Sequence, residues 1–297
     1  MKNIKIYLVA LSALVLTLSC FAEGQARSWV STNGDDKKPC SRQEPCKTFA
    51  GAITKTNAGG EIIALDSGGY GPITITKSIT IDGAGVYAGI NSTSTDNQTA
   101  ISIDAHTDDI VVLRGLTLNG GQSPFYGISI VKAGSVFVEG CTISGFATGV
   151  LSLTDPVFIK DSIIRGNGTG VAPSGGTLEH CRIEKNQTGL IMVDGSSPVT
   201  ISNSVLSGNE SGVDVATSNT NTFLTIERCV ITGIRPSGTI AGIAAGNSAR
   251  IHVSETVVAN YDVGLSHVGG GKIISFGNNR LVHNNTDGAF TSTKPQQ

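Results

Sequence analysis

The segment "VFIKDSIIRGN", Val157 to Asn167, repeats the pattern of "VFVEGCTISGF", Val136 to Phe146. Positions 1, 3, 6 and 8 of this eleven-residue block are mainly apolar or small. Such a pattern predicts two short strands of alternating polarity, separated by a two-residue bend. The block recurs as "VVLRGLTLNGG", "GTLEHCRIEKN", "VTISNSVLSGN", "LTIERCVITGI", "IHVSETVVANY" and "ISFGNNRLVHN". The chain is therefore expected to repeat one small structural unit along most of its length.

A glycine and a mostly aliphatic residue follow each block and predict a third short strand, as in "GVLS" from Gly149 and "GLIM" from Gly189. These glycines stand 19 to 30 residues apart, at Gly127, Gly149, Gly170, Gly189, Gly212, Gly242 and Gly264, with a looser copy at Gly288. Three strands per repeat predict an all-β fold, a parallel β-helix whose coils stack about 4.8 Å apart. Position 8 should form one core column, made of Leu118, Ile143, Ile164, Ile183, Leu206, Ile231, Val258 and Leu281.

The segment "CKTFAGAITKTNAGGEIIALDSGGYGPITITKSITIDGAG", Cys46 to Gly85, precedes these repeats. It resembles the opening segment of secreted proteins of the pectate-lyase-like superfamily. The resemblance implies a single-stranded right-handed parallel β-helix with a short capping helix, here about Thr48 to Thr56. This superfamily includes lyases, hydrolases, epimerases, phage tailspikes and adhesins, so the resemblance implies a fold rather than one activity.

Residues 1–26 have the composition of a secretory signal peptide. Lys2 and Lys5 precede an apolar run that ends at Leu18, and small residues follow. Cleavage after Ala22 or after Ala26 would suit these small residues, and a lipid attached at Cys20 is an alternative. No later segment is long and apolar enough to span a membrane. The sequence therefore predicts a secreted, periplasmic or cell-surface protein.

The remaining chain divides into an N-terminal cap with a short helix and the first strand (27–72), the β-helix coils (73–288) and a disordered tail (289–297). Removal of Lys2, Lys5 and Glu23 from 21 basic and 23 acidic residues leaves 19 and 22, a formal charge of −3. No basic surface for nucleic acid is expected from this balance.

The cysteines separate into two groups. Cys40 and Cys46 lie in a loop-rich segment before the coils and are predicted to form a disulfide that closes the cap. The others share position 6 of the block with two serines, in the order Cys141, Ser162, Cys181, Ser204 and Cys229. Successive cysteines would be two coils apart, about 9.6 Å, which exceeds the roughly 7 Å limit for a disulfide. They are predicted to be buried free thiols, and no metal site is expected among them.

Asparagine recurs at position 11 of the block, at Asn167, Asn186, Asn209 and Asn284. Stacked coils would bring these amides into a hydrogen-bonded ladder. Each also begins an N-x-Ser/Thr triplet, as do Asn91 and Asn97, so glycosylation is the alternative interpretation.

Candidate ligand-binding residues come from an expanded turn and from one acidic position. Phe125 and Tyr126 lie in "GQSPFYG", and aromatic rings suit the apolar faces of sugars, although packing against a neighbouring coil is the alternative. Asp214 is the one acidic residue among the outward positions of the glycine-led strands. Phe137 and Phe158 share position 2 on adjacent coils and should stack outward as a second aromatic surface.

Catalytic residues cannot be assigned. Hydrolysis of a glycosidic bond needs two carboxyl groups flanking that bond, and Asp214 alone does not supply them. A lyase would need a calcium site and a base. The densest acidic cluster is "DAHTDD", with Asp104, His106, Asp108 and Asp109, for which a solvated turn is the alternative interpretation. No cofactor is expected beyond calcium at that cluster.

The sequence favours an exported, non-catalytic β-helix scaffold that is surface-associated or binds polysaccharide. The alternative is a polysaccharide lyase or glycoside hydrolase of the same superfamily. The expected partner is a polysaccharide or another cell-surface component. The identity of the glycan and the oligomeric state stay open.

Overall fold

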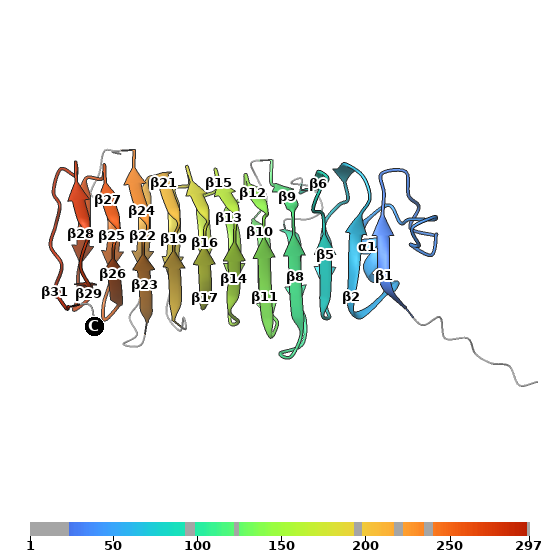
Figure 1. Ribbon diagram of the computed structural model, residues 1–297, viewed down its shortest axis with the longest axis horizontal. Helices are drawn as coiled ribbons and strands as arrows, with labels where there is room; N and C mark the ends of the chain where they lie inside the picture. The colour runs from blue at the N-terminus through green and yellow to red at the C-terminus, as the bar shows by residue number, and fades with distance from the viewer. Residues whose placement is uncertain are drawn as a thin grey trace, which may run out of the picture.

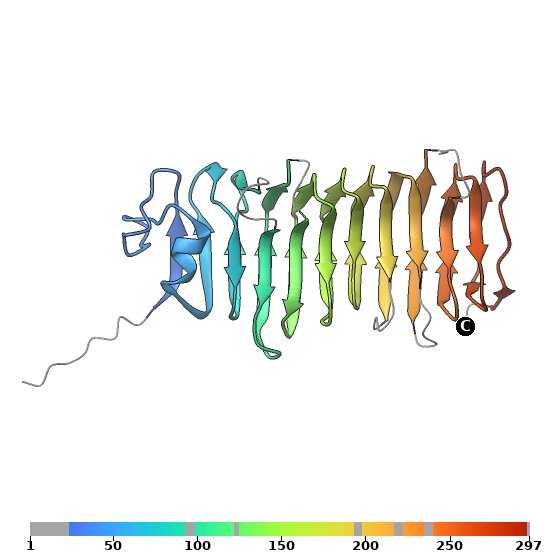
Figure 2. The same ribbon diagram turned by 180° about the vertical axis from the view of Figure 1, so that it is seen from behind.

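The computed structural model describes residues 24–92, 99–121, 125–192, 198–216, 222–234 and 240–295. Within these residues the chain winds as a solenoid whose coils follow one another from the N-terminal to the C-terminal end (Figure 1). The view from behind shows the same succession, with the one short helix at the N-terminal end (Figure 2). The predicted all-β parallel β-helix is confirmed.

The strands of the described residues form three parallel sheets of 12, 10 and 9 strands. The first sheet contains β1 (Gln25–Val30), β2 (Thr56–Ala64), β5 (Ile79–Asp82), β8 (Ile110–Arg114), β11 (Ser135–Glu139), β14 (Val157–Lys160), β17 (Gly176–Glu179), β20 (Val199–Ser202), β23 (Phe223–Glu227), β26 (Arg250–Ser254), β29 (Lys272–Ser275) and β31 (Ser292–Thr293). The second contains β3 (Gly68–Gly69), β6 (Ala88–Asn91), β9 (Leu116–Asn119), β12 (Thr142–Ser144), β15 (Ile163–Arg165), β18 (Arg182–Glu184), β21 (Val205–Asn209), β24 (Val230–Gly233), β27 (Val257–Ala259) and β30 (Arg280–Val282). The third contains β4 (Ile73–Ile75), β7 (Thr99–Asp104), β10 (Tyr126–Lys132), β13 (Thr148–Ser152), β16 (Thr169–Ala172), β19 (Thr188–Met192), β22 (Ser211–Val215), β25 (Ala241–Ala245) and β28 (Val263–His267).

The core is built from columns of aliphatic side chains that run along the solenoid. Ile164 pairs with Ile143 on one side and with Ile183 on the other, and all three are buried. The same register continues to Leu118 and, at the other end, to Leu281, which is partly buried. The column predicted at position 8 is therefore confirmed. Each coil contributes apolar area that only its neighbours can cover, which makes the stack cooperative.

Residues with left-handed backbone make the corners between the first and second sheets. The bend is a single residue in this conformation, for example Asp161 with φ 50°, His180 with φ 51° and Arg228 with φ 49°. Glycine occupies the same place at Gly115 and Gly140, each with φ 60°. Such a residue turns the chain sharply from the first sheet into the second, and the following position 6 can then point inward.

An asparagine ladder lines the corner between the second and third sheets. The Asn167 Nδ2 donates to Asn186 Oδ1 at 3.1 Å, and Asn186 Nδ2 donates to Asn209 Oδ1 at 3.0 Å. Each amide also donates to a backbone carbonyl, as Asn186 does to Ile164 O. All three asparagines are buried, so the predicted ladder is confirmed and these amides are closed to glycosylation.

Helix α1 (Phe49–Ile53) is shorter than the expected span from Thr48 to Thr56. Thr48 caps the helix, because its hydroxyl accepts a hydrogen bond from the Gly51 N–H in the first turn at 2.9 Å. The helix ends because the Ala52 carbonyl accepts from the Lys55 N–H and from the Thr56 hydroxyl, and Thr56 already belongs to β2.

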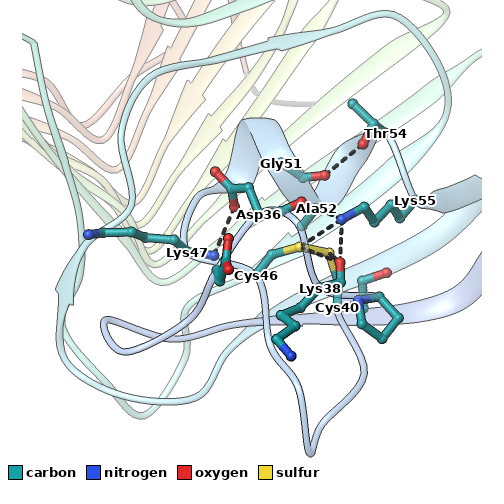
Figure 3. The surroundings of a disulfide bond; sticks show 12 residues. Asp36, Lys38, Cys40, Cys46, Lys47, Gly51, Ala52, Thr54 and Lys55 are labelled. Atoms are coloured by element: carbon teal, nitrogen blue, oxygen red, sulfur yellow. Dashed lines mark hydrogen bonds between the residues drawn. A yellow bond between two sulfur atoms is a disulfide. The ribbon is translucent and has the colours of Figure 1, made fainter.

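A disulfide joins Cys40 and Cys46, the pair predicted from the sequence, with their Cα atoms 4.6 Å apart. Figure 3 shows the Lys55 side chain beside it, donating to the Lys38 carbonyl. Asp36 accepts hydrogen bonds from the backbone of Lys47 and Thr48, which fixes the loop against the start of α1. The loop of the cap is therefore held by a disulfide and by hydrogen bonds to the residues at the start of α1.

The two ends differ from the predicted boundaries. Strands β1, β2 and β3 already belong to the stacked sheets, although the coils were expected from residue 73. At the other end, β31 pairs with β29 within the segment expected to be a disordered tail. The last block is also shifted, because Ile273, not Ile274, pairs with Ile251 at position 1. The last block has one additional residue between position 1, Ile273, and position 8, Leu281, and this residue accounts for the shift.

Candidate functional site

Phe125 and Tyr126 lie where the chain enters β10, at the corner between the second and third sheets. Their ring centroids are 6.1 Å apart with a tilt of 36°. The Phe125 side chain is 48% exposed, while Tyr126 is half-buried and pairs with Thr99 and Thr148 on the neighbouring coils. Phe125 thus presents an aromatic ring to solvent from a position that the sheet holds in place.

Asp214 lies in the middle of β22 on the outer side of the third sheet. Its neighbours on the adjacent coils are Ile191 and Ala244. Within the described residues its carboxylate makes no hydrogen bond or ion pair, and burial raises its pKa. A half-buried carboxyl group among apolar side chains holds its proton more tightly and can donate it. Asp214 alone does not supply the two carboxyl groups that hydrolysis of a glycosidic bond needs.

The structure does not bring Asp214 together with Phe125 and Tyr126. Four strand spacings separate β10 from β22, which corresponds to about 19 Å. The two predicted ligand positions therefore belong to different places on the surface. A single small ligand cannot contact both.

The acidic turn at Asp104 to Asp109 is held by internal hydrogen bonds. Asp109 accepts from the backbone and hydroxyl of Ser78 and from the backbone of His106, and these bonds lower its pKa. His106 Nδ1 is 3.7 Å from an Asp108 carboxylate oxygen. In the part of the chain that the structure describes, no three His, Cys, Asp or Glu side chains are grouped to hold a metal. Asp109 therefore stabilises a turn, and the calcium hypothesis gains no support from it.

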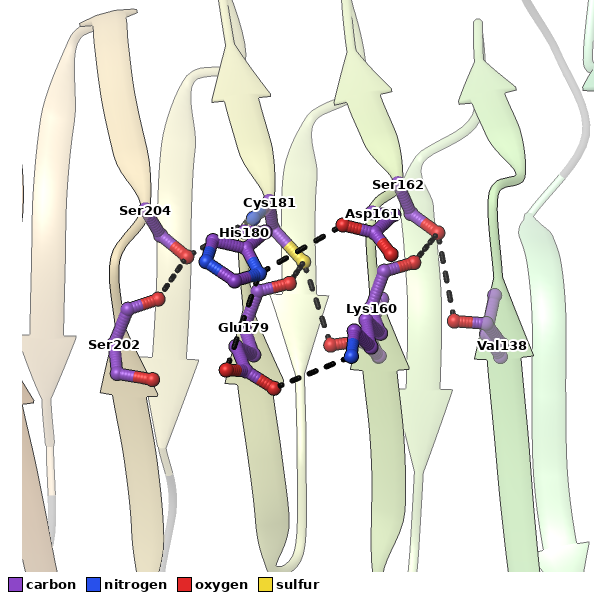
Figure 4. Close-up of polar contacts among 10 residues, drawn as sticks. Val138, Lys160, Asp161, Ser162, Glu179, His180, Cys181, Ser202 and Ser204 are labelled. Atoms are coloured by element: carbon purple, nitrogen blue, oxygen red, sulfur yellow. Dashed lines mark hydrogen bonds and ion pairs between the residues drawn. The ribbon is translucent and has the colours of Figure 1, made fainter.

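The cysteine column is a structural ladder (Figure 4). Cys181 N donates to Ser204 Oγ at 3.0 Å, and Ser162 Oγ donates to the Lys160 carbonyl at 2.8 Å. Cys141, Cys181 and Cys229 are buried and free, as predicted. Burial raises the pKa of Cys141 to about 12 and that of Cys181 to about 11, so these thiols are poor nucleophiles.

His180, beside Cys181 in the sequence, lies on the surface. Its Nδ1 is 3.8 Å from Asp161 and 3.9 Å from Glu179, as Figure 4 shows. Lys160 forms an ion pair with Glu179 of the adjacent coil at 3.9 Å. All of these side chains are largely exposed, so the contacts contribute little to stability.

The outer side of the first sheet carries the predicted aromatic pair. Phe137 and Phe158 stack with centroids 5.0 Å apart and planes 17° apart. Threonines continue this row on the following coils, at Thr177, Thr200 and Thr225, and His252 comes next. The row offers rings at one end and hydroxyl groups along its length.

A cleft of about 470 Å³ at His252 was missed by the sequence analysis. The His252 and Phe276 rings are 5.0 Å apart, and Glu227 and Glu255 also line the cleft. Burial and the charges of Lys294 and Arg250 lower the pKa of His252. Phe276 reaches this place because of the shifted last block, a register change that a fixed eleven-residue template cannot show.

Comparison with known proteins agrees with this architecture. The family model for the right handed beta helix region matches residues 77–224 and 126–287, so the chain belongs to this family. Pectate lyase Pel9A, a solved structure, superposes with a TM-score of 0.64 at 16% identity, over 90% of this chain and 79% of that one. A rhamnogalacturonan lyase gives a TM-score of 0.43 at 10% identity, over 85% and 76%. No curated protein matches the chain.

At these identities the likeness to Pel9A concerns the fold. The described residues contain no helix of the length and apolar character needed to cross a membrane. The predicted signal peptide, residues 1–26, lies almost entirely outside the described residues, and only Gly24, Gln25 and Ala26 are described.

Proposed function

We propose that this protein is an exported, non-catalytic β-helix protein that binds a polysaccharide. The observation that carries the proposal is the exposed ring of Phe125, next to the half-buried Tyr126 where the chain enters β10. The Phe125 carbonyl accepts from the Thr148 N–H at 2.8 Å, and an aromatic ring on an anchored backbone can stack on a sugar ring with less loss of conformational entropy. The fold shared with a pectate lyase is consistent with a carbohydrate ligand.

The two carboxylates at the positions singled out from the sequence, Asp214 and Asp109, support binding without catalysis there. Asp214 lies alone among apolar neighbours, and Asp109 is used by Ser78 and His106 in a turn. Bond cleavage by hydrolysis requires an acid and a second carboxyl group at matched separation. The two ligand candidates, Phe125 and Asp214, lie about 19 Å apart along the solenoid.

Export is part of the same proposal. It rests on the composition of residues 1–26 and is supported by the disulfide between Cys40 and Cys46, a bond that is rare in proteins of reducing compartments. The protein would then act outside the cytoplasm, where polysaccharides are its accessible partners.

The test is affinity electrophoresis of the purified mature protein through gels that contain one polysaccharide each. We expect retardation by at least one polysaccharide, and loss of it in Phe125→Ala and in Tyr126→Ala. Phe223→Ala is a matched control, because it removes a half-buried ring at the start of β23 in the first sheet, on a different sheet from this corner. Unchanged retardation in both corner variants, or no retardation at all, would refute the proposal.

A hydrolase or lyase is the second candidate, and the raised pKa of Asp214 is the observation that favours it. General acid catalysis uses a carboxyl group that holds its proton more tightly than usual, and burial shifts Asp214 in that direction. Turnover of a polysaccharide that disappears in Asp214→Asn, while binding is kept, would establish this alternative.

A further inference from the structure

The corner that carries Phe125 continues along the solenoid as a stripe of hydroxyl groups. Tyr126 pairs with Thr148, Thr148 with Thr169 and Thr169 with Thr188, and the row ends at Ser211. All five side chains are half-buried. Within the described residues the three threonine hydroxyls form no hydrogen bond with the protein, so they are available to a ligand. From Tyr126 to Ser211 the row covers four strand spacings, about 19 Å.

The far end of this row borders a groove of about 500 Å³. Gly166, Gly168 and Gly208 form part of its lining, and Lys185, Glu210 and Ile234 also contribute to it. A Cβ placed on Gly166 would meet no atom within 4 Å, so the space above this residue is open. Ile234 is 60% exposed and supplies an apolar wall.

Lys185 interrupts a column of glycines at this corner. Gly145, Gly166 and Gly208 occupy the equivalent place on neighbouring coils and have left-handed backbone, with φ of 81°, 62° and 65°. Lys185 adopts the same conformation with φ 53°. A side chain in this region costs about 1 kcal/mol or more, which glycine would avoid. Its ammonium group has no partner among the described residues, so this cost is not offset by a contact within the fold.

We propose that this corner binds a neutral polysaccharide whose chain lies along the solenoid axis, from Phe125 to the groove at Lys185. The inference rests on the proposed function and adds to it the surface, the direction and the class of glycan. The open floor at Gly166 lets a sugar ring approach the backbone, and the hydroxyl row faces its hydroxyl groups.

The charges of the groove argue for a neutral glycan. Lys185 and Glu210 both line it, one of each sign, and both are exposed. A chain with a carboxylate on every sugar would meet Glu210 as well as Lys185, and the two interactions would oppose each other. Hydroxyl groups can instead donate to the carboxylate and accept from the ammonium group.

The experiment uses affinity electrophoresis with soluble linear β-glucan, galactomannan and xylan as neutral probes and polygalacturonate as the acidic one. Gly166→Asn fills the groove floor, and asparagine tolerates the left-handed backbone. Gly140→Asn is the matched control, since Gly140 has φ 60° and equally open space at the opposite corner. Lys185→Gly removes the ammonium group and also relieves the backbone.

We expect Gly166→Asn and Lys185→Gly each to weaken binding of a neutral probe about tenfold or more, a loss of about 1.4 kcal/mol. Gly140→Asn should bind as the parent protein does, and Lys185→Gly should melt at the same temperature or higher. Normal binding by Gly166→Asn would overturn the inference, and so would a preference for polygalacturonate. If Phe125→Ala abolishes binding while Gly166→Asn and Lys185→Gly bind normally, the proposed function stands and this inference fails. If the parent protein binds no probe, the proposed function fails first.

Discussion

The side-chain amide of Asn167 donates to the side-chain oxygen of Asn186 at 3.1 Å, although the two residues are 19 apart in the sequence. The same oxygen accepts the Asn167 backbone N–H at 2.9 Å. One buried side chain therefore satisfies two donors of the coil before it. This arrangement locks the register between neighbouring coils.

Replacement of this amide should destabilise the solenoid. In Asn186→Ala the buried N–H groups of Asn167 lose their acceptor, and we expect the free energy of unfolding to fall by about 2–4 kcal/mol. Urea denaturation followed by circular dichroism measures this change. Gln187→Ala, at the exposed neighbouring residue, should cost about 0.5 kcal/mol or less. Equal stability of the two variants would show that the ladder does not hold the coils.

The three buried thiols should resist modification in the folded protein. Because burial raises the pKa of Cys141 to about 12, almost no thiolate is present at neutral pH. We expect iodoacetamide to label Cys141, Cys181 and Cys229 only after denaturation, as read by mass spectrometry of peptides. Labelling of any of them at the rate of a free thiol in the native protein would contradict the buried column.

The disulfide should stabilise the cap. Cys40 and Cys46 close a loop with a sequence separation of 6. The double substitution Cys40→Ser, Cys46→Ser should lower the free energy of unfolding by about 2 kcal/mol, mainly by giving the unfolded chain more freedom. Thermal denaturation of the oxidised parent and the double variant measures the effect. A melting temperature unchanged by the substitution would mean that this loop does not contribute to the cap.

Asp66 should make the cap sensitive to acid. Burial alone would raise its pKa, but hydrogen bonds from Tyr70, Thr32 and Ser31 prevail and lower it from 3.8 to about 2. The folded protein thus binds this proton less tightly than the unfolded chain does. Its stabilising contribution is present above pH 3.8 and is lost as the pH falls towards about 2.

The variant Asp66→Asn should therefore lose about 1–2 kcal/mol of unfolding free energy at pH 7, after allowance for solvent screening, and almost none at pH 2. Denaturation at a series of pH values in the parent and the variant gives the comparison. A difference that stays constant across this range would mean that the charge of Asp66 is not what stabilises the cap.

The position of β1 leads to a prediction about processing. Gln25 N donates to the Lys55 carbonyl at 2.7 Å, so β1 begins before Arg27. Cleavage after Ala22 would preserve this strand, whereas cleavage after Ala26 would remove its first two residues. We expect the exported protein to begin at Glu23, which intact mass measurement of the secreted material can check. A mass that corresponds to a start at Arg27 would contradict it.

Features that repeat along the chain could be predicted from the sequence. The isoleucine column, the spacing of the thiols and the asparagine ladder all follow from one period, because stacking converts a sequence interval into a contact. Short-range interactions at the ends could not be predicted in this way. Thr56 ends the helix by bonding to Ala52 O, and the extra residue near Phe276 depends on contacts of the last coil.

The candidate site was only partly predictable. Phe125 was found because its turn departs from the minimal repeat. The groove at Lys185 carries no such signal, since Gly166 and Gly208 are explained equally well by turn geometry. The aligned blocks do place Lys185 at position 10, where Gly145, Gly166 and Gly208 stand in the neighbouring blocks, but its left-handed backbone and the groove beside it appear only in the structure.

The central claim is that the protein binds polysaccharide without cleaving it. The most direct measurement incubates the mature protein with a polysaccharide that retards it, with and without calcium, and follows new reducing ends and ultraviolet-absorbing unsaturated sugars. We predict no product in either condition, while binding persists and depends on Phe125. Sustained product formation that is abolished by Asp214→Asn would contradict the account and make Asp214 a catalytic residue.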